Sequence, residues 1–402
     1  MKERYYSLDV FRGATVALMI LVNNPGSWAH MYPPLDHAEW HGCTPTDLVF
    51  PFFLFAVGNA MAFVVPRLQQ AGTDGLFWGK VLKRFILIFL IGLFLNWSPF
   101  IKWENNHLVW KAWVDAKNPD SGIRLLGVLQ RIAICYLCAS IIAYYSKPKL
   151  TFYIGTVILL LYWSLCFAFG DSVDPYSLKG FFGTQIDIDL LGKAHVYKGE
   201  GVPFDPEGLI SSIAAIVQVL FGYLIGLYIR EKGKNFEMLS NLFVVGCVLI
   251  FAGFAWDMAF PINKKIWTSS YVVYTTGLAT MVLGVLIYLL EFKNAKGTWS
   301  RFFDVFGKNP LFIFFMSGFL PRLLGLIRIP GSIVDGKQGY YSPFSWFYEY
   351  LCKKPIVWLY EHPFSHFNND PRIASLFYAI CIVMFYWFLA WLLDRKKIYI
   401  KV

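Results

Sequence analysis

The sequence predicts an all-α, polytopic membrane helix bundle of about ten transmembrane helices, with both termini in the cytoplasm. Hydrophobic residues make up 57% of the 402 residues and charged residues only 15%, with a mean hydropathy of +0.49. A soluble domain usually carries about 25% charged residues. The apolar residues also gather into runs of the roughly 20 residues that a helix needs to cross a bilayer. This composition excludes a water-soluble enzyme, a disordered chain and a disulfide-stapled secreted scaffold.

Ten apolar segments follow one another along the chain. They cover residues 8–27, 46–65, 79–98, 124–145, 150–169, 208–229, 238–260, 267–290, 309–328 and 373–393. Each is predicted to be a helix, because backbone groups inside a bilayer have no water to bond. Start signals precede several of them, such as Ser7, Thr44-Pro45 and Asp205-Pro206-Glu207. We expect one domain over residues 1–402, with long outer loops at 28–43, 99–122, 170–207 and 329–372.

The positions of Lys and Arg predict the orientation. If the N-terminus is cytoplasmic, Lys and Arg are roughly three times as dense in the inner connections as in the outer loops, which is the usual bias in membrane proteins. The net charge of +10 therefore reflects topology, and no nucleic-acid partner is expected. The outer loops hold most of the acidic residues, which favours an active face on the outer side. The aromatic segment 344–360 is typical of an interfacial helix.

Ionisable and amide groups within or next to the apolar segments are candidate site residues, because they are costly in lipid. Asp9 and Arg12 are i,i+3 neighbours that either pair with each other or line a site. Asn23 and Asn24 precede Pro25, so they either end the first helix or face the outer mouth. Arg131 follows Gln130 within the fourth apolar segment, and it needs either a protein carboxylate, such as that of Asp9, Asp47 or Asp257, or an anionic ligand.

The segment from His37 to Asp47 carries the strongest candidate for catalysis. His37 and His41 have i,i+4 spacing, but Glu39 does not directly follow the first histidine and no third ligand has a suitable spacing, so no metal site is expected. A neutral imidazole can accept a proton from an attacking amine if a neighbour holds its tautomer. Either Asp36 or Asp47 could do so. The plainer interpretation of His37 is a solvated loop residue.

Several runs resemble the heparan-α-glucosaminide N-acetyltransferase family. They are SLDVFRG (7–13), VNNPG (22–26), HAEWHGCTPTDLVFPFFLFAVG (37–58), GVLQR (127–131), DPEG (205–208), PINKKIWTSSY (261–271) and RKKIYIKV (395–402). The resemblance implies a membrane-embedded transferase that moves acetyl from cytoplasmic acetyl-CoA to a glucosamine amine at the outer face. It also implies His37 as the catalytic histidine and Asn23, in preference to Asn24, as the essential asparagine. His41 stands where we expect Asn in relatives, so it inherits no role.

We combine the resemblance with the polar residues to predict the sites. The expected catalytic residues are His37, Asn23 and Asp47, with Asn23 as the oxyanion donor. The expected acetyl-CoA contacts are Arg131, Gln130, Lys83, Arg84, Lys308, Asn309 and Lys401. The expected acceptor contacts are Asn24, Trp40, Asp257, Asn263 and Trp267.

The acceptor and the cellular location can be predicted only as classes, without assigned residues. Relatives in lysosomes carry an extra lumenal domain that we do not find, so we expect a bacterial cytoplasmic (inner) membrane and an amino sugar such as free glucosamine or a wall-derived unit. The lipid bilayer is the other expected partner, and a homodimer is left open. Direct transfer and an acetyl-histidine intermediate also stay open. The alternatives are an O-acetyltransferase of surface glycans and a solute transporter in which Asp9, Arg12 and Arg131 line the path.

Overall fold

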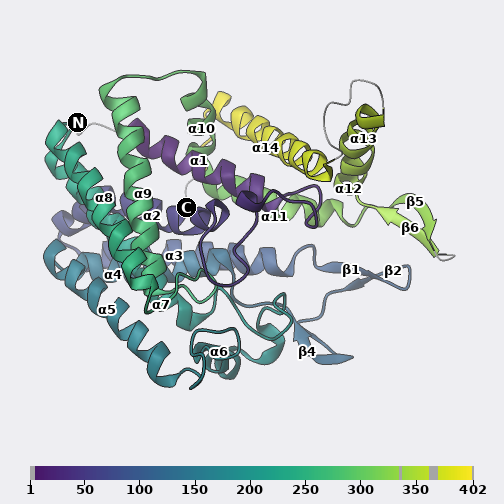
Figure 1. Cartoon of the computed structure of the whole chain (residues 1–402), viewed down its shortest axis with the longest axis horizontal. Coiled ribbons are helices and arrows are strands. Elements are labelled where there is room, and N and C mark those ends of the chain that lie inside the picture. The colour runs from purple at the N-terminus through teal and green to yellow at the C-terminus, as the bar shows by residue number, and fades with distance from the viewer. Residues whose placement is uncertain (1–4, 335–336, 362–369, 401–402) are drawn as a thin grey trace.

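The structure, a computed structural model, describes residues 5–334, 337–361 and 370–400. Each of the ten predicted segments falls on a helix, which confirms the all-α bundle (Figure 1). These helices are α1 (Tyr6–Asn23), α2 (Val49–Ala71), α3 (Asp74–Trp97), α4 (Val128–Tyr145), α5 (Pro148–Phe169), α7 (Leu209–Lys232), α8 (Phe236–Asp257), α9 (Ser269–Ile287), α11 (Pro310–Leu324) and α14 (Pro371–Arg395).

Within the described residues, eight helices are long and apolar enough to cross a membrane, which identifies a multi-pass membrane protein. Eight of the ten predicted segments therefore form helices that are long and apolar enough to span a membrane. The two others are α3, which carries Lys80, Lys83 and Arg84 in one half, and α11, which has only 15 residues. A span needs about 20 apolar residues. Helix α3 falls short because of its charged residues, and α11 because of its length.

The outer loops contain structure that the sequence did not predict. Three antiparallel hairpins project from the bundle, formed by β1 (Ile101–Glu104) with β2 (His107–Trp110), β3 (Val114–Asp115) with β4 (Asn118–Gly122), and β5 (Ile329–Val334) with β6 (Lys337–Tyr341). Helix α6 (Gly183–Leu191) lies in the loop between α5 and α7. The predicted interfacial segment is helical from α12 (Pro343–Phe347) through a π-helical turn (Tyr348–Lys353) to α13 (Lys354–Glu361).

Helices α2 and α7 pack closely at the centre of the bundle, and two glycines allow it. A Cβ on Gly58 would lie 2.1 Å from the carbonyl oxygen of Val219, and one on Gly222 would lie 2.3 Å from that of Phe55. Small residues of this kind let helices approach when no water drives their association. The contact positions α4 and α9 as well, since both pack against α7.

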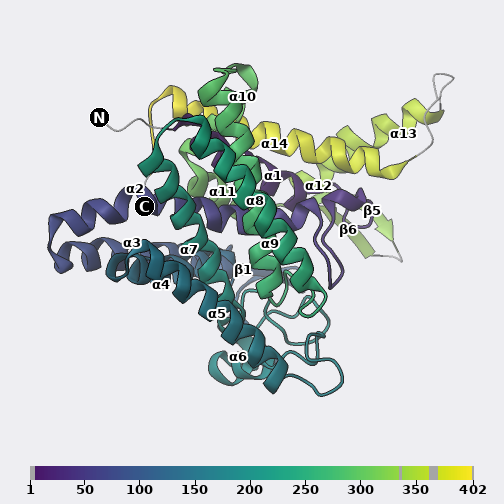
Figure 2. The ribbon, with the colours of Figure 1, turned by 60° about the vertical axis from the view of Figure 1, so that its left-hand side comes forward.

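A second group of helices joins the chain ends to this centre. Helix α1 packs against α10 (Thr298–Lys308) and α14, and a buried cluster that includes Ile20, Phe306 and Tyr386 lies between them. Figure 2 shows this group extending away from α2, α3 and α4. In Figure 1 the hairpins project from one side of the bundle, to the right and the lower right.

Candidate active site

The central feature of the site is a histidine–aspartate pair in the loop before α2. Nδ1 of His37 lies 2.7 Å from Oδ1 of Asp47. The Asp47 side chain is 2% exposed and that of His37 41%, so the carboxylate is buried and the imidazole opens to solvent. This is the orientation that the sequence suggested, with Asp47 rather than Asp36 as the group that holds the ring.

Backbone groups hold the Asp47 carboxylate in place. Its Oδ2 accepts hydrogen bonds from the backbone N–H groups of Ala38 and Thr44, both at 3.0 Å. The Thr44 hydroxyl donates to the same oxygen at 3.1 Å, and the Asp47 carbonyl accepts a 2.5 Å bond from the Tyr271 hydroxyl. Asp47 thus belongs to the capping box that starts a 3₁₀ turn over Pro45–Leu48 and leads into α2. The same fold that begins this helix therefore fixes the carboxylate under the imidazole.

The His37–Asp47 bond determines which ring nitrogen can act as a base. A carboxylate oxygen only accepts, so Nδ1 carries the proton and donates it to Asp47. Nε2 then keeps its lone pair and can take a proton from a bound amine. The arrangement has the chemical form of a general base with a buried orienting group.

A lysine that the sequence interpretation passed over completes this group. Lys264, 227 residues further along, places Nζ 3.1 Å from Nδ1 and 3.5 Å from Nε2 of His37. The same Nζ lies 3.4 Å from Oδ1 of Asp47, and the lysine side chain is only 22% exposed. Burial lowers the pKa of Lys264, and the negative charges of Asp47 and Glu207 oppose that shift. The run PINKKIW was visible in the sequence, but it is also an ordinary outer turn.

These residues line a cavity of about 270 Å³ at the hairpin end of the bundle. Its walls include His37, Asp47, Trp40, Trp267, Arg124, Glu207 and Lys264. Trp40 is held by a 2.8 Å hydrogen bond from its indole N–H to the Tyr176 carbonyl. Two aromatic rings and several charged groups around a small space are features that suit a small polar ring such as a sugar.

The wall opposite His37 is an ion-paired cluster. The Arg124 guanidinium bonds to Asp205 at 2.5–3.0 Å and also to Glu207, and it stacks over the ring of Tyr197 at 4.6 Å. Burial raises the pKa of Glu207, but the charges of Arg124 and Arg131 outweigh it, so the pKa lies below the ordinary value. The carboxylate therefore stays charged and keeps this wall polar.

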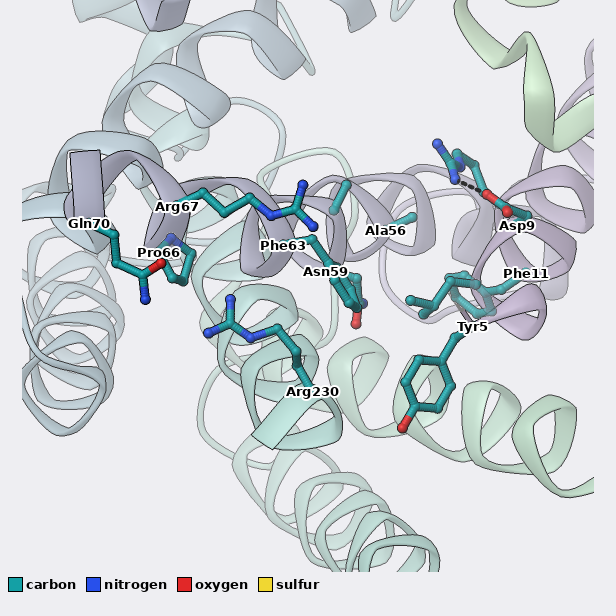
Figure 3. Close-up of a pocket in the computed structure, with 13 residues that line it drawn as sticks. Tyr5, Asp9, Phe11, Ala56, Asn59, Phe63, Pro66, Arg67, Gln70 and Arg230 are labelled. Atoms are coloured by element: carbon teal, nitrogen blue, oxygen red, sulfur yellow. Dashed lines mark hydrogen bonds and ion pairs between the residues drawn. The ribbon is translucent and has the colours of Figure 1, made fainter. Parts of the chain in front are cut away.

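A second cavity, of about 470 Å³, lies between α1, α2 and α7. Figure 3 shows Arg67 and Gln70 of α2 and Arg230 of α7 around it, with Asp9 on the α1 side. Asp9 pairs with Arg12 at 2.5 Å, and both residues also line this cavity, so the two alternatives that the sequence left open occur together. No ion pair to a carboxylate is found for Arg67 or Arg230 among the described residues; Arg230 donates to the Ala62 carbonyl at 2.6 Å.

A third cavity, of about 480 Å³, adjoins the second through Asp9 and Arg12. Arg84 and Lys308 line it, together with Leu129 and Ile132 of α4. The first residue of that helix, Val128, lines the His37 cavity instead. The start of α4 therefore borders both the third cavity and the His37 cavity.

Comparisons with known proteins found one matching family model and two similar curated proteins. Residues 4–175 match the family model described as "Heparan-alpha-glucosaminide N-acetyltransferase, catalytic". The resemblance inferred from the sequence is confirmed over this part of the chain. Among curated proteins, the human heparan-alpha-glucosaminide N-acetyltransferase is 25% identical over 75% of this chain, and the mouse protein is 25% identical over 74%. The chain spans about half the length of these two relatives, since the match covers 50% of each.

The region matched to the N-acetyltransferase model includes Asn23, His37, Asp47, Arg124 and Arg131. Lys264 and Glu207 come from the part of the chain beyond it. The His37 cavity therefore combines residues from the region matched to this family model with residues from beyond it.

Asn23, the asparagine that the resemblance to the N-acetyltransferases implied, does not line the His37 cavity. Its side chain is exposed at the end of α1. Asn24 donates to the Ile20 carbonyl at 2.9 Å, which satisfies a backbone group at the helix end. This arrangement does not support Asn23 as the oxyanion donor, and it favours a helix-ending role for Asn24.

The predicted acceptor contacts divide into two groups. Trp40 and Trp267 line the His37 cavity. Asp257 and Asn263 do not: Asp257 accepts a 2.5 Å bond from the Ile262 N–H, and buried Asn263 accepts a 3.0 Å bond from the Ile266 N–H. Both side chains shape the loop that presents Lys264.

The predicted acetyl-CoA contacts also divide. Arg84 and Lys308 line the third cavity, although Lys308 is paired with Asp304 at 2.8 Å and Asp394 at 3.0 Å. Lys83 is exposed and does not line it, and Asn309 instead bonds the carboxy-terminal tail at Ile398 and Ile400. Lys401 lies outside the described residues.

Arg131 and Gln130 are held inside the protein. Arg131 is 1% exposed and bonds the Ser211 and Ser212 hydroxyls and the Pro206 carbonyl at the start of α7. None of the three predicted aspartates is its partner within the described residues. Gln130 donates to the Leu125 carbonyl at 3.0 Å. Arg131 therefore joins α4 to α7, and its guanidinium faces Trp267 at 5.0 Å from below the pocket.

Proposed function

We propose that this protein is a membrane-embedded acetyltransferase that moves the acetyl group of acetyl-CoA to the amine of a glucosamine or related amino sugar. The observation that carries the proposal is the 2.7 Å bond between His37 Nδ1 and buried Asp47, which leaves Nε2 as a base in a cavity of sugar-like size. The family match supports acetyl transfer as the reaction.

The cationic cavities between α1, α2, α4 and α7 suit the nucleotide end of acetyl-CoA. That end carries a diphosphate and a third phosphate, and guanidinium groups bind phosphate through paired hydrogen bonds. Arg67 and Arg230 would hold one part of it and Arg84 another. The Nε atoms of Arg84 and Arg230 are buried without a hydrogen-bond partner in the described structure, which fits a role in binding an anion.

The two cavities that border α4 suggest how the acetyl group would reach His37. The pantetheine arm is long and largely uncharged, so it would pass Leu129 and Val128, which are apolar neighbours on either side of the boundary. The thioester would then lie beside Nε2 of His37. The distribution of Lys and Arg along the chain supports an inner position for the nucleotide and an outer position for the acceptor.

The chain's residues would act on the acceptor in a defined order. Trp40 and Trp267 bind the sugar ring, and the ion pairs around Arg124 position its hydroxyls. The amine nitrogen attacks the thioester carbonyl carbon, and Nε2 of His37 takes the proton that nitrogen loses. The C–S bond then breaks, and the imidazolium returns the proton to the departing sulfur. Asp47 stabilises the imidazolium in between.

The test is acetyl transfer by the purified full chain in lipid nanodiscs. Acetyl-CoA is supplied with glucosamine, galactosamine or N-acetylglucosamine, and release of free thiol and formation of acetylated sugar are measured together. We expect turnover with the free amines and none with N-acetylglucosamine, which offers only hydroxyls. Turnover with N-acetylglucosamine would point to O-acetylation, and a protein that binds but never consumes acetyl-CoA would contradict the proposal.

A further inference from the structure

We propose that Lys264 is a further catalytic residue, whose ammonium group faces the oxygen that becomes negatively charged when the amine attacks the acetyl carbonyl. The inference rests on the proposed function and adds a residue that neither the family resemblance nor the sequence pattern assigned. It replaces Asn23, which does not line the pocket, as the group that stabilises this charge.

Lys264 lies beside the nitrogen atom of His37 that would act as the base. Nζ lies 3.5 Å from Nε2 of His37, the nitrogen that takes the proton. The carbon under attack must lie within about 3–3.5 Å of the amine nitrogen, and the amine must hydrogen-bond to Nε2. The carbonyl oxygen is bonded to that same carbon, so an ammonium group beside the imidazole is within reach of it.

The loop that carries Lys264 is held rigidly. Between α8 and α9, the Asn263 N–H donates to the Thr268 hydroxyl and the Thr268 N–H donates to the Asn263 carbonyl, both at 3.0 Å. The Ile266 N–H donates to the Asn263 side chain at the same distance. A cation that is already fixed where charge develops stabilises the transition state without reorganisation cost.

Burial lowers the pKa of Lys264, and the negative charges around it oppose that shift. Asp47 lies 3.4 Å away, and the charge of Glu207 also acts on it. Among the described residues, the carboxylate paired with this ammonium is that of Asp47, which also bonds His37, and Lys264 lines the cavity beside them.

The electron movements balance without another reactant. The amine lone pair forms the C–N bond while the carbonyl π pair moves to oxygen, next to Nζ of Lys264. That pair then re-forms the carbonyl as the C–S bond breaks, and the sulfur receives the proton that His37 took from the amine. Lys264 keeps all its protons throughout.

The experiment compares Lys264→Met, which keeps length without charge, with Lys264→Arg, which keeps the charge. We expect Lys264→Met to lower kcat about 100- to 1,000-fold, the usual cost of one lost oxyanion donor, with KM for acetyl-CoA within about 3-fold. Lys264→Arg should recover part of kcat. The matched control is Lys193→Met, at an exposed lysine outside the cavity, which should match the wild type.

A pH profile separates this role from a structural one. Removing a positive charge 3.1 Å from the imidazole makes a second protonation of that ring easier. The acid limb of kcat/KM should therefore move to higher pH in Lys264→Met and stay in place in Lys264→Arg. The other groups that face Nζ are Asp47, Cys43 and Glu207, and all three are unchanged in both variants.

Chemical rescue distinguishes loss of the ammonium group from misfolding of the variant. In Lys264→Cys, alkylation with 2-bromoethylamine rebuilds an ammonium at nearly the original length, and activity should rise at least 10-fold over the unmodified variant, with the treated wild type as reference. The inference is overturned if Lys264→Met keeps more than a third of the wild-type kcat, or if restoring the ammonium restores nothing. Failure of the wild type itself to transfer acetyl would instead overturn the proposed function.

Discussion

Oδ1 of Asp47 lies 2.7 Å from Nδ1 of His37, while Oδ2 of the same carboxylate closes the turn that starts α2. One side chain thus performs a structural and a chemical task. The backbone N–H groups of Ala38 and Thr44 fix Oδ2, so Oδ1 cannot rotate away from the imidazole. Substitutions of His37 and Asp47 therefore test directly whether this hydrogen bond is needed for acetyl transfer.

Replacing His37 by alanine should lower kcat roughly 10²- to 10⁴-fold, the usual range for loss of a general base. Acetyl-CoA binding should stay within a few-fold, because the arginine-lined cavities lie elsewhere. His41→Ala is the matched comparison: His41 contacts Asn263 at 3.4 Å and does not line the pocket, so its effect should be much milder. Near-normal turnover by His37→Ala would remove this residue from the mechanism.

Asp47→Asn should be almost as damaging as His37→Ala. The amide can present N–H to Nδ1, which moves the imidazole proton to Nε2 and removes the base. The amide keeps the shape of the turn but removes the negative charge that is paired with Lys264, so the melting temperature should also fall. We expect kcat to fall roughly 100-fold or more, measured by thiol release. A variant with full kcat would show that tautomer control by Asp47 is unnecessary.

Arg84→Gln should raise KM for acetyl-CoA about 10-fold, since one charge-assisted hydrogen bond to phosphate is lost. The adjacent Lys83→Gln is the matched comparison, because Lys83 is exposed and does not line the cavity. Its KM should change less. Equal effects would mean that the nucleotide binds outside the third cavity.

Asp187 provides a test of stability against pH. It is 2% exposed in α6, accepts a 2.9 Å bond from the Leu209 N–H, and burial raises its pKa to about 6. The folded state therefore binds a proton more readily than the unfolded state, where the pKa is 3.8. This group lowers stability above pH 6, and the penalty is relieved as pH falls from about 6 towards 4.

Asp187→Asn removes that penalty and keeps an oxygen to accept the Leu209 N–H. Its melting temperature should exceed that of the wild type at pH 7.5, and the difference should shrink by pH 5. Asp189→Asn, at an exposed position on the same helix, should show neither effect. An advantage that is equal at both pH values would contradict the raised pKa.

The orientation can be tested by accessibility labelling. Single cysteines introduced at Lys147, between α4 and α5, and at Lys193, in the α6 loop, should react with an impermeant reagent from opposite sides of the membrane. Lys147 should be protected in intact cells and Lys193 labelled. Labelling of both from the same side would contradict the assignment of outer and inner loops.

Much of the site could be anticipated because it lies close together in the chain. His37 and Asp47 are ten residues apart, and Asp9 and Arg12 are three apart. Local spacing alone brings such residues within reach. Arg131 shows the limit of this reasoning, since a buried guanidinium can be satisfied equally by carboxylates or by hydroxyls and carbonyls. Only the packing of α4 on α7 selects Ser211, Ser212 and Pro206 as its partners.

The sequence by itself determined the helices, because an apolar run in lipid can satisfy its backbone only by coiling. It also singled out His37 as the candidate base, in a short polar loop between two apolar segments, but left Asp36 and Asp47 as alternative partners. The tertiary structure decided which distant groups join them. Lys264 reaches His37 from 227 residues away, whereas Asn23 remains outside the pocket. Such contacts depend on how helices cross and loops close, and no local pattern of residues encodes that geometry.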